Sequence, residues 1–374
     1  MKIGILTFHR AENFGAVLQA YALQTFLQNE GCDAFIIDYR NLSIEAMYDV
    51  FNPGILFARK NIFKSLRLYI TRFNHVQNRY QCKYKYRDFR KKFFNLTEKV
   101  KTLNNLAKEF DCIIAGSDQI WNLHLTGGLD RNYFLAFSRN YRTKKISYAV
   151  SAEYDPCDLL SHYKDKISKL LNDFDYLSVR EEFFKNELQK YTAKEIAVCL
   201  DPTFLLKGGQ YKEMTWKPLD KSYILVYHMT PIPMGTMLAE KIATVKDYKV
   251  IEIHIGYGEH QNDERHKINL GPLDILSYIA WAEEIITSSF HGLALSLIMQ
   301  KDVWVVNKGN NLRQRNLLTS LGLEERLLTE LDDYKDQKIN YDAVEKKLGS
   351  RIKYSKDFIL HAVFENYEKD CVLS

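Results

Sequence analysis

The feature that most constrains the fold of this chain is a repeated alternation between short apolar runs and longer segments with helical periodicity. Ala16, Ala20, Leu23 and Leu27, for example, share one face of a helix that would follow the first apolar run. Strands that alternate with helices are typical of parallel sheets covered by helices, so we expect an α/β fold. The apolar runs lie near residues 2–8, 34–38, 111–115, 146–151, 177–180 and 197–200 in the first half, and near 223–228, 249–255, 284–288 and 302–306 in the second.

The two groups of runs indicate two α/β units. Gly208-Gly209, Pro218 and several lysines follow the sixth run, a composition typical of a joint between domains. We therefore predict a first domain of residues 1–206, with a basic helical insertion near 55–101, and a second domain of residues 207–374. At 374 residues, with 46% hydrophobic and 26% charged side chains, the chain is long enough for both domains to bury sizeable cores.

Several features predict a cytoplasmic protein. Met1-Lys2 leads directly into an apolar run, so we expect no signal peptide, and the longest apolar runs are too short to cross a bilayer. The cysteines include no CxxC pair, which favours reduced thiols over a disulfide framework or a zinc site. They are Cys32, Cys82, Cys112, Cys157, Cys199 and Cys371.

Polar side chains collect where several of the predicted strands end. The run that ends near residue 288 continues through Ser289 and Phe290 to His291 and Gly292, and opens an apolar helix. The backbone N–H groups and the positive dipole end at such a helix start suit an anion, beside which His291 would lie. Because ligands bind at the carboxyl ends of strands in open α/β sheets, four such turns predict one shared crevice. The other three turns are His9–Gly15, with Asn13 as a helix cap, Gly116–Asn122, and the turn at Arg180.

The order and spacing of these segments resemble those of the polysaccharide pyruvyl transferase family over most of the chain. One position departs from the pattern, because many members carry an arginine two residues before the motif histidine, where this chain has Ser289. The resemblance implies two facing Rossmann-like domains of the glycosyltransferase B kind, with the last helix, near Asp357–Glu368, packing back on the first domain. The matching segments are Asn13–Leu23, Gly116–Asn122, Ser178–Arg180, Asp201–Thr203, Thr287–Gly292 and Arg315–Arg326.

The resemblance also implies an activity, the transfer of pyruvate from phosphoenolpyruvate onto two hydroxyls of a sugar in a capsule or exopolysaccharide precursor. The sugar diol would be linked to a lipid or a nucleotide, and the products would be a cyclic ketal and phosphate. This chemistry needs a proton donor for the methylene carbon and clamps for a carboxylate and a phosphate. It does not require a metal, so we expect no metal and no cofactor besides phosphoenolpyruvate as the co-substrate.

On the donor side, His291 is the predicted general acid. Arg180 is the first predicted clamp, because a guanidinium matches a carboxylate or phosphate with two parallel hydrogen bonds. The alternative for Arg180 is a surface ion pair with a neighbouring glutamate. Arg315, with Arg313 beside it, would supply the cation that Ser289 lacks, unless Arg315 only caps a helix. The remaining predicted donor-binding residues are Ser288, Ser289, Phe290 and Gly292.

On the acceptor side, Asp118 and Gln119 supply the groups that bind sugar hydroxyls, and Trp121 offers a ring face to the sugar. Asp118 is the second predicted catalytic residue, as a general base for a hydroxyl. His9 and Asn13 are placed beside the same cleft. The alternative for this segment is structural, with Asp118 capping a helix and Trp121 in the core.

Basic residues are concentrated in one part of a chain whose formal net charge is +5. Between Arg59 and Lys101 they far outnumber the acids Asp88 and Glu98, and aromatic residues lie among them. We favour solvated helices that pack Phe89 on the core. The alternative is peripheral contact with the anionic inner face of the membrane. No nucleic-acid-binding signature accompanies the segment, so we expect no nucleic acid partner.

Two other classes of function stay open. A nucleotide-sugar-dependent glycosyltransferase has the same two-domain plan, and Asp38, at the end of the second run, would then meet a ribose. The lack of a GxGxxG motif after the first run speaks against it. A non-catalytic anion-binding relative is the other class, because Ser289 stands where an arginine is usual. The Asp201-Pro202-Thr203 turn is interpreted as structural and left outside the site.

Overall fold

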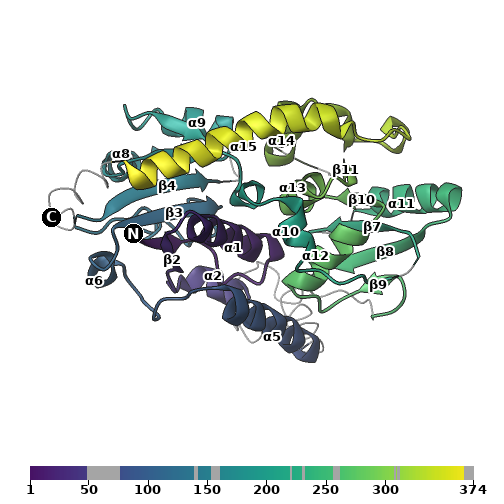
Figure 1. The fold of residues 1–374 in the computed structure, drawn as a ribbon, viewed down its shortest axis with the longest axis horizontal. Helices are drawn as coiled ribbons and strands as arrows, with labels where there is room; N and C mark the ends of the chain where they lie inside the picture. The colour runs from purple at the N-terminus through teal and green to yellow at the C-terminus, as the bar shows by residue number, and fades with distance from the viewer. Residues whose placement is uncertain are drawn as a thin grey trace.

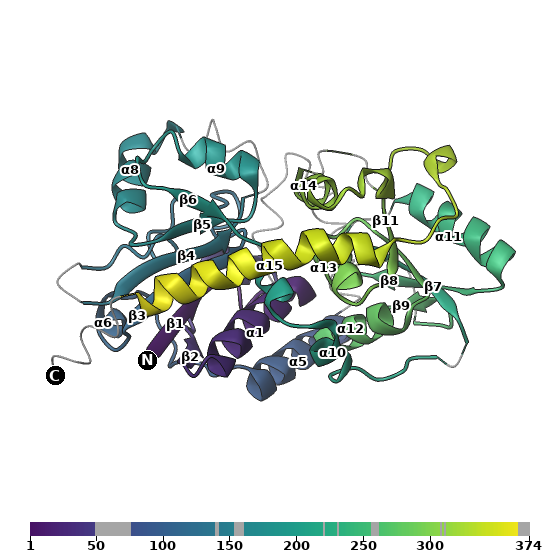
Figure 2. The same ribbon diagram turned by 45° about the horizontal axis from the view of Figure 1, so that its top comes forward.

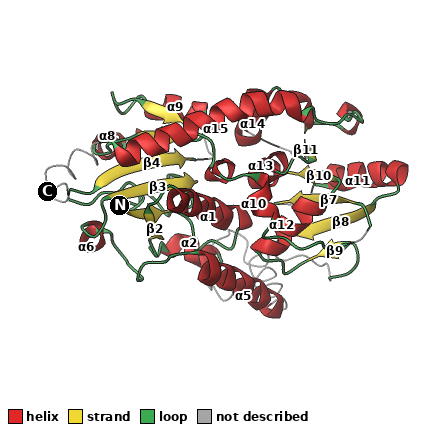
Figure 3. Cartoon of the chain, in the orientation of Figure 1, coloured by secondary structure: helices red, strands yellow, loops and turns green. Residues whose placement is uncertain are grey.

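The computed structural model describes residues 1–48, 76–138, 142–152, 161–219, 221–229, 232–255, 262–306, 309 and 312–365. Two six-stranded sheets form the body of the protein, and helices pack against both (Figures 1 and 3). Every predicted strand is present. The two strands that the sequence analysis missed, β9 and β12, have only two residues each, too few to produce a recognisable apolar run.

The first sheet is parallel and has the strand order β2-β1-β3-β4-β5-β6. Its central strands are buried along almost their whole length, which explains why they are continuous apolar runs and not alternating ones. The strands are β1 Lys2–Leu6, β2 Asp33–Ile36, β3 Cys112–Asp118, β4 Lys144–Val150, β5 Leu177–Val179 and β6 Ile196–Val198.

The second sheet is also parallel and has the order β12-β11-β10-β7-β8-β9. The predicted boundary at residue 206 falls between β6 and β7, and the division into two domains at that residue stays a prediction. The strands are β7 Tyr223–His228, β8 Lys249–His254, β9 His266–Lys267, β10 Glu284–Thr287, β11 Asp302–Val306 and β12 Leu327–Leu328.

The helices of the described residues connect these strands. The longer ones are α1 Phe14–Asn29, α5 Val76–Phe93, α8 Lys164–Asn172, α11 Pro233–Lys246, α12 Pro272–Trp281, α13 Phe290–Ile298, α14 Leu312–Leu321 and α15 Tyr341–Phe364. The shorter ones are α2 Leu42–Met47, α6 Asn104–Ala107, α9 Glu182–Leu188, η1 Pro202–Leu205, α10 Gly208–Lys212, η2 Glu324–Arg326 and η3 Leu331–Asp333.

One apolar cluster runs from the first sheet into the second. It contains Ile3 and Val17 on one side, and Leu225 and Ile285 on the other. At the junction, the rings of Phe14 and Tyr227 meet edge to face with centroids 5.2 Å apart. The two halves therefore share a core, which fixes their relative position more firmly than the polar interfaces usual between domains.

The helix α15 crosses from the second half to the first, where it lies against β4 (Figures 1 and 2). Lys144, at the start of β4, donates to the carbonyl oxygens of Ala362 and Val363 at the end of the helix, at 3.2 and 2.9 Å. In the middle of the helix, the Ser355 hydroxyl accepts from the Leu200 N–H at 2.9 Å. The helix is longer than predicted, because its periodic pattern begins at Tyr341.

The helix α5 carries part of the predicted basic insertion, and the rest of that insertion, residues 55–75, lies outside the described residues. Tyr86 and Phe89 are buried, which supports the core-packing interpretation. Lys85 pairs with Asp274 of α12 at 2.6 Å, so one side of α5 faces the second half and not solvent. No helix of the described ranges has both the length and the apolar character needed to cross a membrane. Contact of α5 with a membrane stays a prediction.

The Ser355 hydrogen bond provides a test of how α15 is held. Ser355→Ala leaves the buried Leu200 N–H without an acceptor, so we expect the free energy of unfolding to fall by about 1–3 kcal/mol. Ser350→Ala is the matched control, because Ser350 lies on the same helix, is exposed and bonds only within the helix. Denaturant titration of both variants checks this. Equal stabilities would show that the bond does not hold the helix.

Candidate functional site

The site lies where the strand order of each sheet reverses. In the first sheet the reversal is between β1 and β3, and in the second it is between β7 and β10. Neighbouring connections leave in opposite directions at such a point and open a crevice beyond the carboxyl ends of the strands. The shared core holds the two halves so that their crevices face each other.

A cavity of about 350 Å³ lies in this crevice. Residues from both halves line it, so the predicted convergence of the strand-end turns is seen for the turns after β1, β3 and β10. It is lined from the first half by Phe8, Ala11, Asn13, Ala16, Ile44, Met47, Tyr48, Asp118, Gln119 and Leu125, and from the second half by Met229, Ser288, Ser289, Phe290, His291, Arg313 and Gln314.

The start of α13 forms the second-half wall of the cavity. Ser289 is the N-cap, and its Oγ accepts from the Gly292 N–H at 3.2 Å. Gly292 is therefore not a free donor, contrary to the prediction that its N–H would hold an anion. Phe290 and His291 keep the N–H groups that a helix start leaves without an intrahelical acceptor. The replacement of arginine by Ser289 thus supplies a helix cap in place of a cation.

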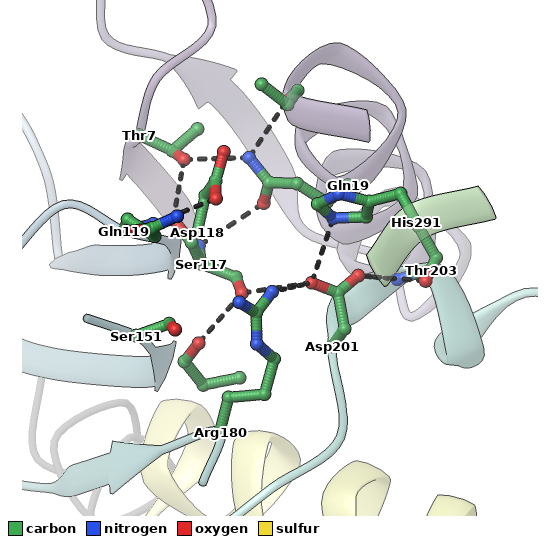
Figure 4. A network of polar contacts seen from close by, with 12 residues as sticks. Thr7, Gln19, Ser117, Asp118, Gln119, Ser151, Arg180, Asp201, Thr203 and His291 are labelled. Atoms are coloured by element: carbon green, nitrogen blue, oxygen red, sulfur yellow. Dashed lines mark hydrogen bonds and ion pairs between the residues drawn. The ribbon is translucent and has the colours of Figure 1, made fainter. Parts of the chain in front are cut away.

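His291 is hydrogen-bonded to a carboxylate that the sequence analysis left outside the site. Its Nε2 lies 3.3 Å from Asp201 Oδ2, and both side chains are buried (Figure 4). An ionised carboxylate accepts, so Nε2 carries a proton. The other ring nitrogen, Nδ1, has no hydrogen-bond partner among the described residues.

Asp201 is the centre of the polar network in Figure 4. Its Oδ2 accepts from Arg180 Nη1 at 2.8 Å and lies 3.3 Å from Ser117 Oγ. Its Oδ1 accepts from the N–H and hydroxyl of Thr203, at 3.0 and 2.8 Å. Burial alone would raise the pKa of Asp201, but His291, Arg180 and the Thr203 N–H hold it well below its ordinary value. Asp201 is therefore a fixed anion behind His291.

The structure does not place Arg180 on the cavity wall. Arg180 is 4% exposed, and its guanidinium binds Glu181 through Nε at 2.7 Å as well as Asp201. The side chain lies 4.2 Å from the ring centroid of Phe290, which does line the cavity. Arg180 is therefore not a surface residue, and its role as a donor clamp stays a prediction. It neutralises two buried carboxylates and so positions Asp201.

Close packing fixes the other side of the His291 ring. A Cβ atom on Gly15, in the first turn of α1, would lie 2.1 Å from His291 Nδ1 and 2.2 Å from its Cγ. Only glycine allows this approach. The backbone of α1 therefore orients a histidine that belongs to the other half of the molecule.

The first-half wall carries the predicted acceptor residues Asp118, Gln119 and Asn13. Asp118 ends β3 and does not cap a helix, and its Oδ1 accepts from the Gln119 N–H at 2.9 Å. Asn13 caps α1, as predicted, by accepting from the Ala16 N–H. Gly116, with φ at 144°, makes this turn, because a Cβ there would lie 2.0 Å from the carbonyl oxygen of Tyr148.

Two predicted acceptor residues lie elsewhere. Trp121 is 1% exposed, stacks on Phe134 and donates to the carbonyl oxygen of Tyr133, so it is a core residue and cannot present a face to a sugar. His9 is buried behind the wall, and its Nε2 lies 3.2 Å from Asp38. Its burial lowers its pKa, although Asp38 opposes the shift.

The second-half arginines and Asp38 also differ from the predictions. Both arginines lie on α14. Arg313 lines the cavity, whereas Arg315 is exposed on another side of the helix. Asp38 binds Arg10 and Arg40 besides His9, so it is not placed to bind a ribose. Of the cysteines, Cys32, Cys82, Cys112 and Cys199 are free thiols, and the other two lie outside the described residues.

The fold and the cavity together define two Rossmann-like domains, with the start of α13 of the second half lining a cavity that both halves share. A profile of the polysaccharide pyruvyl transferase family matches residues 13–309. The match covers most of the chain, and the protein belongs to this family of transferases. No curated protein sequence matches the chain.

Solved structures agree on the fold. A Listeria monocytogenes protein assigned as a UDP-N-acetylglucosamine 2-epimerase superimposes with a TM-score of 0.52 at 10% identity, covering 98% of this chain and 97% of that one. The UDP-GlcNAc 2-epimerase from Neisseria meningitidis has a TM-score of 0.46 at 11% identity, with 97% and 94% covered. Spinosyn forosaminyltransferase has 0.43 at 9% identity, with both chains fully covered at 100%. The superposition on the Listeria monocytogenes protein supports the predicted fold of two facing Rossmann-like domains, the glycosyltransferase B-like arrangement.

The contact between Gly15 and His291 can be tested directly. Gly15→Ala must displace the His291 ring or the start of α1, so we expect the free energy of unfolding to fall by about 1–3 kcal/mol, the cost of overpacking. The His291 ring signals in the NMR spectrum should also shift. Gly209→Ala is the control, because nothing lies within 4 Å of a Cβ at that helical glycine. Unshifted His291 signals would contradict the packing described.

Proposed function

We propose that this protein transfers pyruvate from phosphoenolpyruvate onto two hydroxyls of a sugar in a surface polysaccharide precursor, with formation of a ketal and release of phosphate. The observation that carries the proposal is the His291–Asp201 pair at the start of α13, in a cavity that both halves line. A proton donor, anion-binding groups and a hydroxyl-binding wall meet there, and the reaction needs all three.

The donor is proposed to lie against α13 with its phosphate and carboxylate toward the second half. The N–H groups of Phe290 and His291 and the positive end of the helix dipole favour an anion there. Arg313 adds a full positive charge to the same wall. Ser288 Oγ accepts from the Met229 N–H, which fixes the hydroxyl beside the expected position of the anion.

His291 is proposed to give a proton to the methylene carbon of the donor. A protonated imidazole has a proton on each nitrogen, and Asp201 holds the one on Nε2. The proton on Nδ1, which Asp201 does not hold, is the one proposed for transfer, and Nδ1 lies beside Gly15 of α1. Asp201 would stabilise the imidazolium and keep the ring in one orientation, as buried carboxylates do for histidines in other active sites.

Asp118 is proposed to accept the proton of the first sugar hydroxyl as its oxygen bonds to the cationic carbon. The carbon–oxygen bond to phosphate then breaks, the second hydroxyl closes the ring, and its proton leaves with the phosphate. Asp118 lines the cavity on the wall opposite α13, and only one of its carboxylate oxygens is engaged by a described residue. Gln119 lies beside it on the same wall.

The cellular location of the enzyme is also part of the proposal. Phosphoenolpyruvate and carrier-linked sugars would meet this enzyme in the cytoplasm, at the inner face of the membrane. Exposed basic residues of α5 with Tyr84 among them support peripheral contact. These residues are Lys83, Arg87, Lys91 and Lys92.

The arginine assignments lead to a paired test of donor binding. Arg313→Gln removes a charge from the cavity wall, so we expect phosphoenolpyruvate to bind about 10- to 150-fold more weakly, equivalent to about 1.5–3 kcal/mol for a charge-assisted bond. Arg315→Gln, two residues away on the exposed side of α14, should leave affinity unchanged. Calorimetric titration measures both. Loss of affinity in Arg315→Gln alone would reverse the assignment.

The role of His291 is tested by separating donor binding from turnover. His291→Gln has no titratable proton, so phosphate release should fall by about 10²–10⁴-fold while phosphoenolpyruvate still raises the melting temperature. His361→Gln, at an exposed site on α15, is the control. In deuterated water, the methyl group of the wild-type ketal should gain one deuterium. A thermal shift with UDP-sugars but not with phosphoenolpyruvate would contradict the proposed donor and favour a glycosyltransferase.

A further inference from the structure

A second cluster of polar side chains lies at the carboxyl ends of β8 and β9, outside the cavity. Glu252 and His254 alternate along β8 and so point to the same face of the sheet. The register pairs Glu252 with His266 of β9. One ligand atom from each of the three side chains lies within 4.8 Å of the other two.

The two histidines of the cluster are hydrogen-bonded to each other. His254 Nε2 and His266 Nδ1 are 2.8 Å apart. Two nitrogens bound to one tetrahedral zinc ion are about 3.3 Å apart, given zinc–nitrogen bonds of about 2.0–2.1 Å. The two ring nitrogens would have to move apart by about half an ångström to bind one ion. A small rotation of either side chain is enough for this.

The carboxylate of the cluster is held from two sides. Arg265 donates to Glu252 Oε1 at 2.7 Å, and the Thr236 hydroxyl of α11 donates to Oε2 at 3.2 Å. Contacts of this kind orient metal ligands in general. Glu252 itself is buried, so its position does not depend on solvent.

An independent observation comes from the neighbouring strand. His228 of β7 is the register partner of His254 and is 8% exposed, so a third imidazole is buried beside the cluster. Gly235 of α11 packs against it, since a Cβ there would lie 2.1 Å from His228 Nε2.

We propose that Glu252, His254 and His266 form a binding site for a divalent transition-metal ion of the zinc or cobalt class. Two imidazoles and one carboxylate suit zinc, cobalt or nickel, whereas magnesium and calcium prefer oxygen ligands alone. The sequence analysis predicted no metal because it searched the cysteines and the reaction chemistry. The ligands here are brought together by strand register, over a connection that spans residues 255–265.

The ion would stabilise the second sheet and would take no part in the proposed reaction. None of the three ligands lines the cavity. β9 has two residues and is an edge strand, so few backbone hydrogen bonds hold it to β8. A metal ion that joins β8 to β9 would therefore add a cross-link at an edge of the second sheet where the strand has only two residues.

The test is metal binding by the full chain. After treatment with a chelator and dialysis, wild-type protein should bind one Co²⁺ per chain with visible absorption bands, and Zn²⁺ should displace it. His254→Gln and His266→Gln should each weaken Zn²⁺ binding by at least about 100-fold, whereas His361→Gln should not change it. Mg²⁺ should not compete. Zn²⁺ should also raise the melting temperature of the wild type but not of the two variants.

Zinc-edge X-ray absorption of the wild type keeps the proposal testable if a variant fails to fold. Two imidazole nitrogens at about 2.0 Å with oxygen completing the shell are expected. Sulfur ligands would place the ion at cysteines and overturn the proposal. Binding of less than one ion per chain, or equal affinity in His254→Gln and wild type, would also overturn it.

Discussion

The site depends on one buried carboxylate, that of Asp201. A charge that is removed from water is tolerated only if several donors surround it, and Asp201 has Arg180, His291 and Thr203. These partners come from the end of β5, the start of α13 and the turn after β6, so the same carboxylate joins both halves of the molecule. Loss of the Arg180 guanidinium would leave two buried carboxylates, Asp201 and Glu181, without their shared cation, at a cost of about 3–5 kcal/mol. The orientation of His291 and the relative position of the two halves are therefore coupled.

That coupling explains how charge is distributed around the cavity. Arg180 balances Glu181 and Asp201 through Nε and Nη1. Ser289 is used to cap α13. In the proposed reaction, positive potential for the anionic donor would come from the helix start and from Arg313 of α14, which lines the cavity. We propose that Arg313, on the helix that follows α13 and β11, supplies the cation that Ser289 does not.

The shared apolar core makes this arrangement rigid. Phe14 and Tyr227 pack across the junction, Gly15 lets α1 approach the His291 ring, and α15 crosses from one half to the other. Interfaces between Rossmann-like domains are often polar and open on a hinge, but an interface continuous with both cores resists such motion. Catalytic groups held this way keep their geometry without a bound ligand, which favours reaction over reorganisation.

The sequence by itself determined the elements and the family. Buried parallel strands are continuous apolar runs, and helix caps such as Asn13 act over three residues, so both can be read locally. It also determined that His291, Ser288, Asp118 and Gln119 lie at strand ends. Tertiary structure alone decided which strand-end residues face the cavity. Trp121 and His9 turn into the core, Arg313 replaces Arg315, and Asp201 becomes the partner of His291 across 90 positions of sequence. The physical reason is that the direction of a side chain and its charge partners depend on how the two sheets pack against each other. A local sequence pattern does not encode the packing of segments that are far apart in the chain.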